Sequence, residues 1–360
     1  EAGLNAYRFS IEWARIEPKQ GVYDENEIEH YRKVLTCCRE NGVEPIVTMM
    51  HFTSPKWLIE NGGWENEATV EAFKNYCQYV TEQLGDLMHY VCTINEANMG
   101  IQVAAISARY RAQMMAKMQR MQQGGAEEKK DLEGTAQVGM NFNDMMANMQ
   151  KQKEENVEIF GTDTLQTFVS ARTPEGDMLV IRAHQAARAA MKAVKPELQI
   201  GLTLSLHDIQ AQEGGEETAA KEWVDEFTHY VPYIKEDDFF GLQNYSRSLI
   251  GPNGILPVPE GAEITQMDYE YYPEGLEHVI RRVYEEMPMP IMVTENGIAT
   301  ADDTRRVAYI QTAMKGVENC IQDGIPVKGY MYWSMMDNFE WQKGFGMTFG
   351  LISVDRTTQT

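Results

Sequence analysis

Two glutamates each follow an apolar segment of strand length. Glu96 follows the run YVCTIN, and Glu295 follows PIMVT. A carboxylate at the end of a buried segment is costly to desolvate unless neighbouring groups stabilise it or chemistry uses it. One such glutamate alone is more often a helix cap or the partner of an arginine. Two of them, on segments far apart in the sequence, indicate a pair of carboxyl groups that can act together.

Such a pair is what the hydrolysis of a glycosidic bond requires. One carboxylic acid protonates the leaving oxygen, and a carboxylate about 5–5.5 Å away attacks the anomeric carbon, so that the configuration is retained. The acid needs a raised pKa, whereas the nucleophile needs an ordinary or lowered one. Asn95 precedes Glu96 and Asn296 follows Glu295. An amide beside the acid can hydrogen-bond the sugar 2-hydroxyl.

Seven apolar segments of strand length alternate with amphipathic helices. The predicted strands are 4–11, 43–51, 88–95, 198–205, 239–245, 290–295 and 327–333. The predicted helices are 24–42, 67–84, 178–194, 275–287 and 303–322. This alternation predicts an α/β protein with a parallel sheet covered by helices. Because no Gly-rich dinucleotide or phosphate motif follows any strand, we expect a (β/α)8 TIM-type barrel rather than a doubly wound sheet.

Residues 99–162 interrupt this alternation. The segment is rich in methionine, and Gly124 and Gly125 divide it into two helical pieces. We expect either an amphipathic hairpin that buries its methionine face or a lid beside the site, for which the adaptable thioether is suited. With this excursion included, we expect residues 1–360 to form a single catalytic barrel domain.

The composition excludes several classes of partner. The 360 residues include 54 acidic and 32 basic side chains, which gives a net charge of −22 and a pI near 4.8. Nucleic acids and anionic membrane surfaces both require clustered lysine and arginine, so we expect neither. No apolar run approaches the roughly 18 residues of a membrane span.

The cysteines and histidines show no ligand or disulfide pattern. Five cysteines without regular spacing predict free thiols in a reducing cytoplasm. The seven histidines are scattered and form no HxH or HExxH pair. We therefore expect no metal and no cofactor, and a metal-dependent barrel hydrolase is a weaker alternative.

Four sequence runs carry a resemblance to a known family. They are YRFSIEWARIEP at 7–18, CTINEAN at 92–98, VTENGIA at 293–299 and YWSMMDNFEWQKGFGMTFGLISVD at 332–355. They resemble glycoside hydrolase family 1, the β-glucosidase family, and follow its order along the chain. TENG and YWS-x-x-DNFEW together are highly specific to it. The resemblance implies a retaining β-glycosidase with Glu96 as acid/base and Glu295 as nucleophile.

The resemblance also implies the residues that bind the sugar. Arg8 corresponds to the arginine on the floor of the site that holds the nucleophile ionised. His51 and Asn95 correspond to residues that bind sugar hydroxyls, Asn95 at the 2-hydroxyl. Without the resemblance, His51 would be read as a core histidine. Tyr245 corresponds to the tyrosine that hydrogen-bonds the nucleophile, and Trp333 to the platform under the sugar ring.

Glu340 and Trp341 correspond to the pair that contacts the distal sugar hydroxyls. Family members that act on 6-phosphorylated sugars replace this acid and add a serine and a lysine for the phosphate. Here Glu340 would repel a phosphate dianion, and the run GMTF at 346–349 lacks the Ser-x-Lys-x-Tyr pattern. We therefore expect a small unphosphorylated β-glycoside, most simply a β-glucoside, as the substrate.

Three single residues depart from the family pattern. Ala97 replaces the proline that usually follows the acid/base, which restores a backbone N–H. Phe52 stands where a tryptophan usually follows the histidine, and Gln243 stands in place of an asparagine. Each substitution is compatible with hydrolysis and can alter the preference for a sugar.

The resemblance further implies a first strand, with a glutamine that grips the sugar, before Glu1, and a helix after Asp355. Neither is in the sequence. Seven strands leave a gap in an eight-stranded barrel, and the strands ending at Ile11 and Trp333 would face each other with unpaired edges. Such edges allow a homo-oligomer. We expect reduced stability and weak turnover, and the alternative is a truncated, non-catalytic barrel.

Overall fold

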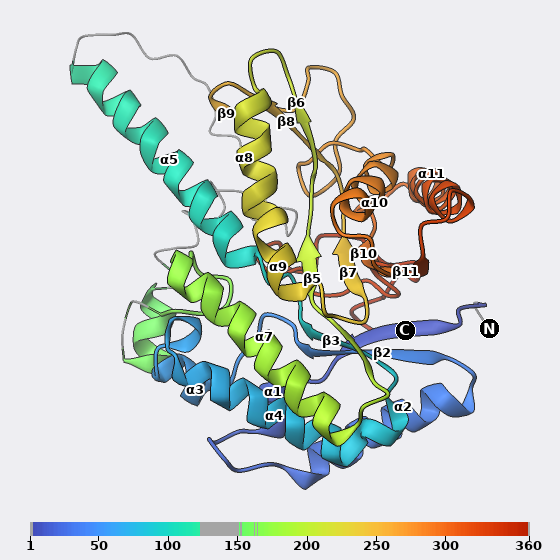
Figure 1. Cartoon of the computed structure of the whole chain (residues 1–360). Coiled ribbons are helices and arrows are strands. Elements are labelled where there is room, and N and C mark those ends of the chain that lie inside the picture. Colours follow the sequence, from blue (N-terminus) through green and yellow to red (C-terminus); the bar gives the residue numbers. More distant parts are fainter. Residues whose placement is uncertain (1–2, 123–150, 152, 162, 164, 359–360) are drawn as a thin grey trace.

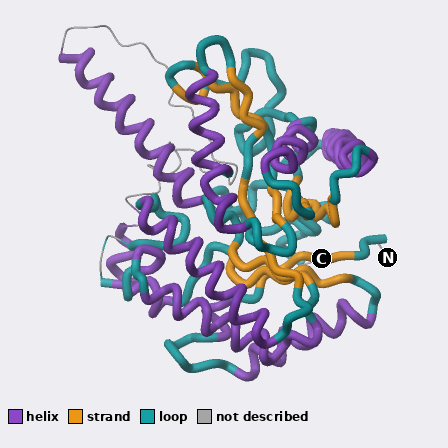
Figure 2. Tube along the Cα trace, viewed as in Figure 1, coloured by secondary structure: helices purple, strands orange, loops and turns teal. Residues whose placement is uncertain are grey.

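The computed structural model describes residues 3–122, 151, 153–161, 163 and 165–358. Helices lie on the outside of a centre of strands, as Figures 1 and 2 show. The helices are α1 Trp13–Ile16, α2 Glu25–Glu40, α3 Lys56–Glu60, α4 Ala68–Leu84, α5 Met99–Gln122, α7 Pro174–Val194, α8 Glu216–Glu226, α9 Val231–Ile234, α10 Gly275–Glu286 and α11 Asp303–Gln322. Three short 3-10 turns complete them: η1 Gly63–Glu65, η2 Gly85–Leu87 and η3 Thr228–Tyr230.

Two parallel sheets build the centre. The first has the order β1-β2-β3-β4, and the second has the order β11-β10-β7-β5. Their bounds are β1 Ala6–Ser10, β2 Glu44–Met50, β3 Tyr90–Ile94, β4 Gln199–Gly201, β5 Thr203–Ser205, β7 Phe240–Gln243, β10 Ile291–Asn296 and β11 Val327–Tyr332. Every pairing within these two sheets is parallel. The predicted alternation of parallel strands and helices is therefore confirmed.

The strand predicted at 198–205 is divided into β4 and β5. β4 pairs with β3, whereas β5 pairs with β7, and only Leu202 separates them. The break has a local cause, because the Leu202 N–H donates to the carboxylate of Asp237 at 3.1 Å instead of to a neighbouring strand. The segment thus passes from one sheet to the other, and the sheets form one curved wall of seven strand positions.

The wall does not close. β1 and β11 are the outermost strands of their sheets and are not paired with each other. A cavity of about 430 Å³ lies between them. The fold is accordingly an incomplete (β/α)8 TIM-type barrel, as the count of seven strands predicts.

A third, small sheet was not predicted. It consists of β6 Asp208–Ala211, β8 Arg247–Gly251 and β9 Gly254–Ile255 in the order β6-β8-β9. In the chain, β6 follows the barrel strand β5, and β8 and β9 follow the barrel strand β7. Helix α8 next to it was also not predicted, because it begins after Gly215 without a side-chain cap.

The helix boundaries follow from capping residues. Asp24 accepts a hydrogen bond from the Asn26 N–H and begins α2, as predicted. α7 begins at Pro174 rather than at the predicted residue 178, because Thr173 caps it and proline is favoured in the first turn. The remaining predicted helices agree with α4, α10 and α11 to within two residues at each end.

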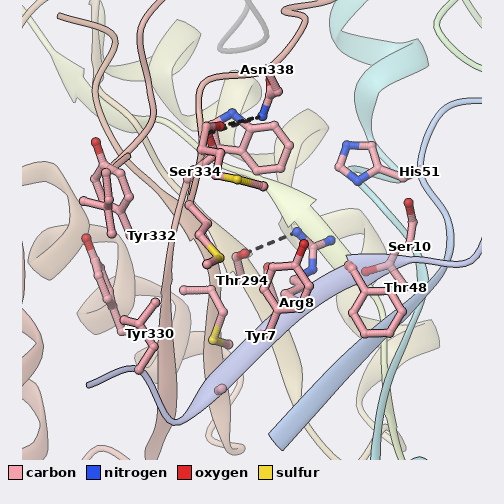
Figure 3. A pocket seen from close by; sticks show the side chains of 18 of the residues that line it. Tyr7, Arg8, Ser10, Thr48, His51, Thr294, Tyr330, Tyr332, Ser334 and Asn338 are labelled. Carbon is pink, nitrogen blue, oxygen red and sulfur yellow. Dashed lines mark hydrogen bonds between the residues drawn. The ribbon is translucent and has the colours of Figure 1, made fainter. Parts of the chain in front are cut away.

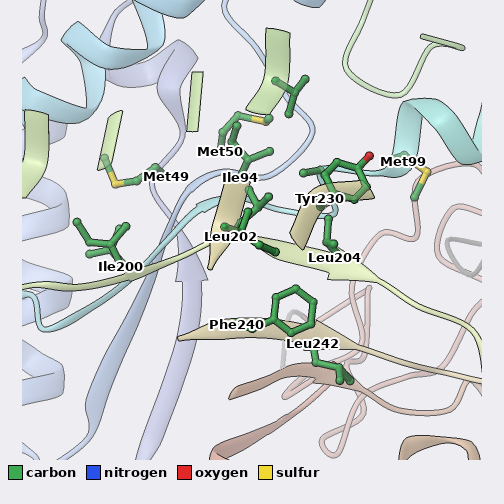
Figure 4. Packing of buried hydrophobic residues seen from close by; sticks show 14 of the residues in the cluster. Met49, Met50, Ile94, Met99, Ile200, Leu202, Leu204, Tyr230, Phe240 and Leu242 are labelled. Carbon is green, nitrogen blue, oxygen red and sulfur yellow. The ribbon is translucent and has the colours of Figure 1, made fainter. Parts of the chain in front are cut away.

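The apolar core joins the strands to the surrounding helices. Figure 4 shows its central part, where side chains of β2, β3, β4, β5 and β7 meet. Tyr76 of α4 is fully buried, and its hydroxyl donates to the carbonyls of Ile11 and Met49 at 3.0 Å each. This contact ties α4 to the ends of β1 and β2, where the site begins.

The methionine-rich excursion is only partly described. α5 is described as far as Gln122, and residues 153–160 are helical. The predicted division at Gly124 and Gly125 lies outside the described residues. Met115 is 62% exposed, so at this position the expected burial of the methionine face is wrong. The other methionines between residues 116 and 150 lie outside the side chains that the structure describes.

Candidate active site

The carboxylate of Glu295 lies at the end of β10 and is held by a cation and a hydroxyl. Nη1 of Arg8, on β1, lies 2.6 Å from Oε1 of Glu295. The hydroxyl of Tyr245, which follows β7, donates to Oε2 at 2.7 Å. Both side chains of the ion pair are only 6% exposed. Glu295 is thus buried with a guanidinium on one carboxylate oxygen and a hydroxyl donor on the other.

Arg8 also connects Glu295 to the end of β3. Its Nη2 donates to Oδ1 of Asn95 at 2.5 Å, and Nε2 of Gln243 donates to the same oxygen at 2.8 Å. Gln243, noted above as a departure from the family, therefore orients Asn95. Because two donors occupy the oxygen, the amide nitrogen of Asn95 must point the other way, toward the cavity and His51.

The protonation of His51 follows from this arrangement. Nδ2 of Asn95 lies 3.2 Å from Nε2 of His51. Since an amide nitrogen only donates, Nε2 accepts and the proton of a neutral ring sits on Nδ1. Burial and the charge of Arg8 lower the pKa of His51 to about 3. His51 is thus a neutral ring with an N–H to offer a hydroxyl oxygen.

Glu96 has a different environment from Glu295. It follows β3 with a φ of 44°, a left-handed conformation that is unfavourable for a glutamate. Two backbone bonds hold it there: the Glu96 N–H donates to the Thr203 hydroxyl at 3.0 Å, and the Ala97 N–H donates to the Thr203 carbonyl at 3.0 Å. The N–H that Ala97 restores in place of the family's proline is therefore used.

The carboxyl group of Glu96 is buried, and one of its oxygens lacks a hydrogen-bond partner. It is 1% exposed, and its Oε2 has no hydrogen-bond partner. Burial in the first place, and then the charge of Glu295, raise the pKa of Glu96 well above its ordinary value. The two carboxyl groups of the site thus differ in their surroundings: Glu295 is paired with a guanidinium, whereas Glu96 has a raised pKa and an oxygen without a hydrogen-bond partner.

Aromatic rings form another wall of the site. The ring of Trp333, which follows β11, stacks on His51 with centroids 5.8 Å apart, and Trp341 lies 6.0 Å from His51. Phe52 packs against Trp341 at 5.1 Å. Trp333 and Trp341 keep partly exposed faces, so they can offer apolar area to a ligand.

Glu340 lies beside these rings in a tight turn. Its N–H donates to the carbonyl of Gly344 at 2.8 Å, and its carbonyl accepts from the Gly344 N–H at 2.7 Å. Glu340 is 5% exposed. Burial and the negative charge of Glu295 raise the pKa of Glu340 to about 8.

One small pocket collects these residues. A cavity of about 20 Å³ is lined by both Glu96 and Glu295. His51, Tyr245, Trp333, Glu340 and Trp341 also line it. Arg8 and Asn95 reach it through their bonds to Glu295 and His51. All nine residues singled out in the sequence therefore come together, because each lies on a barrel strand or at or beyond the carboxyl end of one.

Two residues of the pocket were not predicted from the sequence. Met267 and Phe349 both line it, and both are buried. Phe349 lies within the run quoted for the resemblance, so its position carried a signal that was not used. Met267 lies in a loop with no chemical motif, and only the folded chain brings it to the site.

The described residues hold no sign of a metal site or a membrane span. No group of three or more metal-binding side chains occurs among them. Within the same part of the chain, no helix is long and apolar enough to cross a bilayer.

An α/β barrel with two carboxyl groups at strand ends in one pocket, one paired with an arginine and one with a raised pKa, defines a glycosidase-type site. Comparison with known proteins agrees. A family model described as glycosyl hydrolase family 1 matches residues 1–360. Beta-glucosidase A of Acetivibrio thermocellus is 27% identical over 393 residues, covering 99% of this chain and 80% of that protein. The beta-glucosidase of an Agrobacterium species is also 27% identical, covering 100% and 78%.

Solved structures give the same result. A structure described as beta-glycosidase BGL167 has a TM-score of 0.83 and 40% identity, covering 99% of this chain and 79% of that one. Another, described as a beta-glucosidase 1317, also has a TM-score of 0.83, with 36% identity. The chain belongs to glycosyl hydrolase family 1.

Proposed function

We propose that this protein is a retaining β-glycosidase that hydrolyses terminal, unphosphorylated β-linked sugars, with β-glucosides as the preferred class. One observation carries the proposal: Glu96 and Glu295 line the same pocket, with Arg8 bound to Glu295 and no hydrogen-bond partner for Oε2 of Glu96, whose pKa is raised. Division of a carboxyl pair into an acid and a nucleophile is what this reaction requires.

In the first step, Glu295 attacks the anomeric carbon and Glu96 donates its proton to the leaving oxygen. Arg8 keeps Glu295 ionised, and Tyr245 aligns its second oxygen. The raised pKa of Glu96 keeps the proton in place until it is needed. The product is a glycosyl ester on Glu295 and a free alcohol.

In the second step, Glu96 is a carboxylate and acts as a base. It removes a proton from water, which attacks the same carbon and releases Glu295. Asn95 is oriented by Arg8 and Gln243 so that its amide N–H₂ can donate to the sugar 2-hydroxyl. This hydrogen bond from Asn95 to the 2-hydroxyl strengthens as charge develops in the transition state.

The remaining polar residues are assigned to sugar recognition. The Nδ1–H of His51 donates to a hydroxyl oxygen, and the ring of Trp333 provides a platform for the sugar. Glu340 and Trp341 contact the hydroxyls far from the anomeric carbon. Because Glu340 has a pKa of about 8 and is largely neutral at pH 7, the proposed preference for unphosphorylated sugars rests on the run GMTF at 346–349, which lacks the phosphate-binding pattern, and not on repulsion by Glu340.

We further propose a cytoplasmic location. Support comes from the cysteines, because all five are free thiols. Thiols without disulfides are typical of reducing compartments.

Trapping of the covalent intermediate tests the proposal. A 2-deoxy-2-fluoro β-glucoside with a dinitrophenyl leaving group should inactivate the protein and add one sugar mass to the peptide that carries Glu295. Glu295→Ala should abolish both the labelling and the release of dinitrophenol from the unfluorinated glucoside. Glu260→Gln, an exposed loop glutamate, is the matched control and should retain both. Labelling of a different carboxylate, or full turnover by Glu295→Ala, would contradict the assignment.

A further inference from the structure

Two buried arginines contact the elements that carry the two carboxyl groups of the site. Arg8 binds Glu295 directly, and Figure 3 shows Arg8 in the cavity between β1 and β11, where it also donates to the carbonyl of Thr294. Arg172 lies in the loop just before α7 and is 5% exposed. Its guanidinium donates to backbone carbonyl groups rather than to a carboxylate. A buried cation with such partners calls for a reason other than charge pairing.

The guanidinium of Arg172 holds the turn that follows Glu96. Its Nη1 donates to the carbonyl of Ala97 at 3.0 Å. Its Nη2 donates to the carbonyl of Phe168 at 2.9 Å, and the backbone N–H of Arg172 donates to the carbonyl of Gly100 at 3.1 Å. Arg172 thus joins the loop before α7 to the beginning of α5, directly beside the acid.

The surroundings of this guanidinium leave it little room. A Cβ atom added at Gly100 would lie 2.3 Å from Nε of Arg172, so glycine is needed where the guanidinium lies against α5. Cζ of Arg172 lies 4.4 Å from the centroid of the Phe168 ring. Phe168 is itself fully buried. These contacts fix the guanidinium in the position from which it reaches the Ala97 carbonyl.

The charge of Arg172 is only loosely balanced. Its Nη1 lies 3.9 Å from Oδ1 of Asp177. Asp177 has closer partners, because the Tyr230 hydroxyl donates to it at 2.7 Å and Nε2 of His229 lies 3.0 Å away. Nε of Arg172 has no hydrogen-bond partner. A buried ion pair of this kind contributes little to stability, so the place of Arg172 beside the acid points to a use in function.

The turn at Glu96 needs an anchor because its backbone is strained. Glu96 has a φ of 44°, which a glutamate rarely adopts. Ala97 leaves the next φ angle free, whereas a proline would fix it. Thr203 accepts hydrogen bonds from the N–H groups of Glu96 and Ala97. Arg172 adds a hydrogen bond to the carbonyl of Ala97, so this residue is held at both its N–H and its C=O.

We propose that Arg172 is a positioning residue for the acid Glu96, and this inference rests on the proposed function. Arg172 does not line the pocket and acts through the carbonyl of Ala97. Without this hydrogen bond, the turn relaxes from its left-handed conformation and the carboxyl group of Glu96 moves away from the leaving oxygen. Proton donation then slows, while the attack by Glu295 continues.

A second route from Arg172 to the site runs through aromatic rings. Phe168 stacks on Phe52 with centroids 6.0 Å apart, and Phe52 lines the pocket. If Arg172 acted only by supporting these rings, its loss would raise KM by the same factor for every glucoside. If it acts through Glu96, the loss of rate depends on the leaving group, since only a poor leaving group needs the acid.

The leaving-group dependence tests the proposal. Arg172→Met removes the donors and keeps an apolar side chain. With phenyl β-glucoside, kcat/KM should fall at least about tenfold, a part of the roughly 10²–10⁴ that a general acid contributes, and with dinitrophenyl β-glucoside less than about threefold. Arg172→Lys keeps the charge and one donor group and should lose less. Arg182→Gln, at an exposed arginine of α7 that pairs with Glu67, is the matched control and should lose nothing.

Two further measurements separate positioning from a general structural effect. In the Glu96→Ala background, Arg172→Met should cause no further loss of kcat/KM, since both changes act on the same step. In Arg172→Met alone, the alkaline limb of kcat/KM should move to lower pH, because a less buried Glu96 ionises more easily. Gly100→Ala, which displaces the guanidinium, should reproduce the leaving-group dependence and the pH shift. It replaces Arg172→Met if that variant does not fold.

The outcomes distinguish this proposal from the proposed function. Equal losses for both glucosides, a full additional loss in the Glu96→Ala background, or an unmoved alkaline limb would overturn the positioning role of Arg172, while the glycosidase function stands. Absence of turnover and of Glu295 labelling in the wild-type protein would instead overturn the proposed function, and the positioning role with it.

Discussion

Arg8 is the residue on which the electrostatics of the site depend. Its guanidinium contacts the carboxylate of Glu295, the amide of Asn95 and the Thr294 carbonyl. The same positive charge lowers the pKa of His51 and partly offsets the burial of Glu96. One buried cation thus favours an ionised nucleophile and a neutral imidazole in the same pocket, while the acid farther along the wall stays protonated.

The pH dependence of activity should report the proton on Glu96. Protonated Glu96 is the active form in the first step, so kcat/KM should fall on the alkaline side as Glu96 ionises. Because the pKa of Glu96 is raised well above its ordinary value, this fall should occur well above pH 4.5. Glu96→Ala should lose the alkaline limb and about 10²–10⁴ in rate with a poor leaving group, but far less with dinitrophenol. An unchanged alkaline limb in Glu96→Ala would assign that limb to another group.

Glu340 should make the protein less stable as the pH rises. Its pKa is about 8 in the folded protein and 4.5 in an ordinary environment. Between these values the folded state binds more protons than the unfolded state, so the free energy of unfolding falls with increasing pH. Glu340→Gln removes this dependence. The free energy of unfolding of the variant, relative to that of the wild type, should therefore increase by on the order of 2 kcal/mol when the pH is raised from 5 to 8. Urea unfolding at pH 5 and at pH 8 measures the free energy of unfolding. Glu260→Gln is the control and should follow the wild type.

At the scale of elements, the strand ends place the chemistry. Glu295 belongs to β10 itself, whereas Glu96 lies two residues beyond β3 and needs support from β5. Thr203 gives that support with its hydroxyl and its carbonyl, which is available because the strand breaks at Leu202. The division of one predicted strand into β4 and β5 is therefore linked to the position of the acid.

Removal of the Thr203 hydroxyl should impair the acid specifically. Thr203→Val keeps the shape of the side chain but leaves the buried Glu96 N–H without a partner, which costs about 1–3 kcal/mol. We expect kcat/KM to fall about tenfold or more, and more steeply for poor leaving groups than for dinitrophenol. Thr203→Ser keeps the hydroxyl and should retain most of the activity. An equal loss for both kinds of leaving group would show a general structural effect instead.

At the scale of the whole molecule, the net charge and the open barrel wall are the features that bear on stability. The net charge of −22 is unbalanced, and the barrel wall ends at β1 and β11. Like charges repel one another most strongly in the compact folded state. An open wall forgoes the strand pairing that a closed barrel has. We expect both features to reduce the stability of the chain.

Salt should therefore stabilise the protein. An increase from 0.01 to 0.2 M NaCl shortens the screening length from about 30 Å to about 7 Å and weakens the repulsion. We expect the midpoint of thermal unfolding to rise by about 1–2 °C, which corresponds to about 1 kcal/mol for a chain of 360 residues. Scanning calorimetry at several salt concentrations measures the change. A fall in the midpoint would mean that surface ion pairs, rather than net repulsion, control stability.

Much of the fold could be predicted because its signals are local. The alternation of apolar strands with amphipathic helices, the cap at Asp24, and the absence of a phosphate-binding motif all act within a few residues. The third sheet and the break at Leu202 could not be predicted. They depend on contacts with residues that are distant in the sequence, such as Asp237. No motif in the neighbouring residues predicts them.

The amino-acid sequence by itself determined which residues stand at the ends of barrel strands, because apolar periodicity and the family motifs place Glu96, Glu295 and His51 there. Only the tertiary structure decided their chemical states. Protonation of Glu96 and neutrality of His51 depend on burial and on the distance to Arg8 and Glu295. These are properties of three-dimensional surroundings, since desolvation and Coulomb interactions act through space and not along the chain.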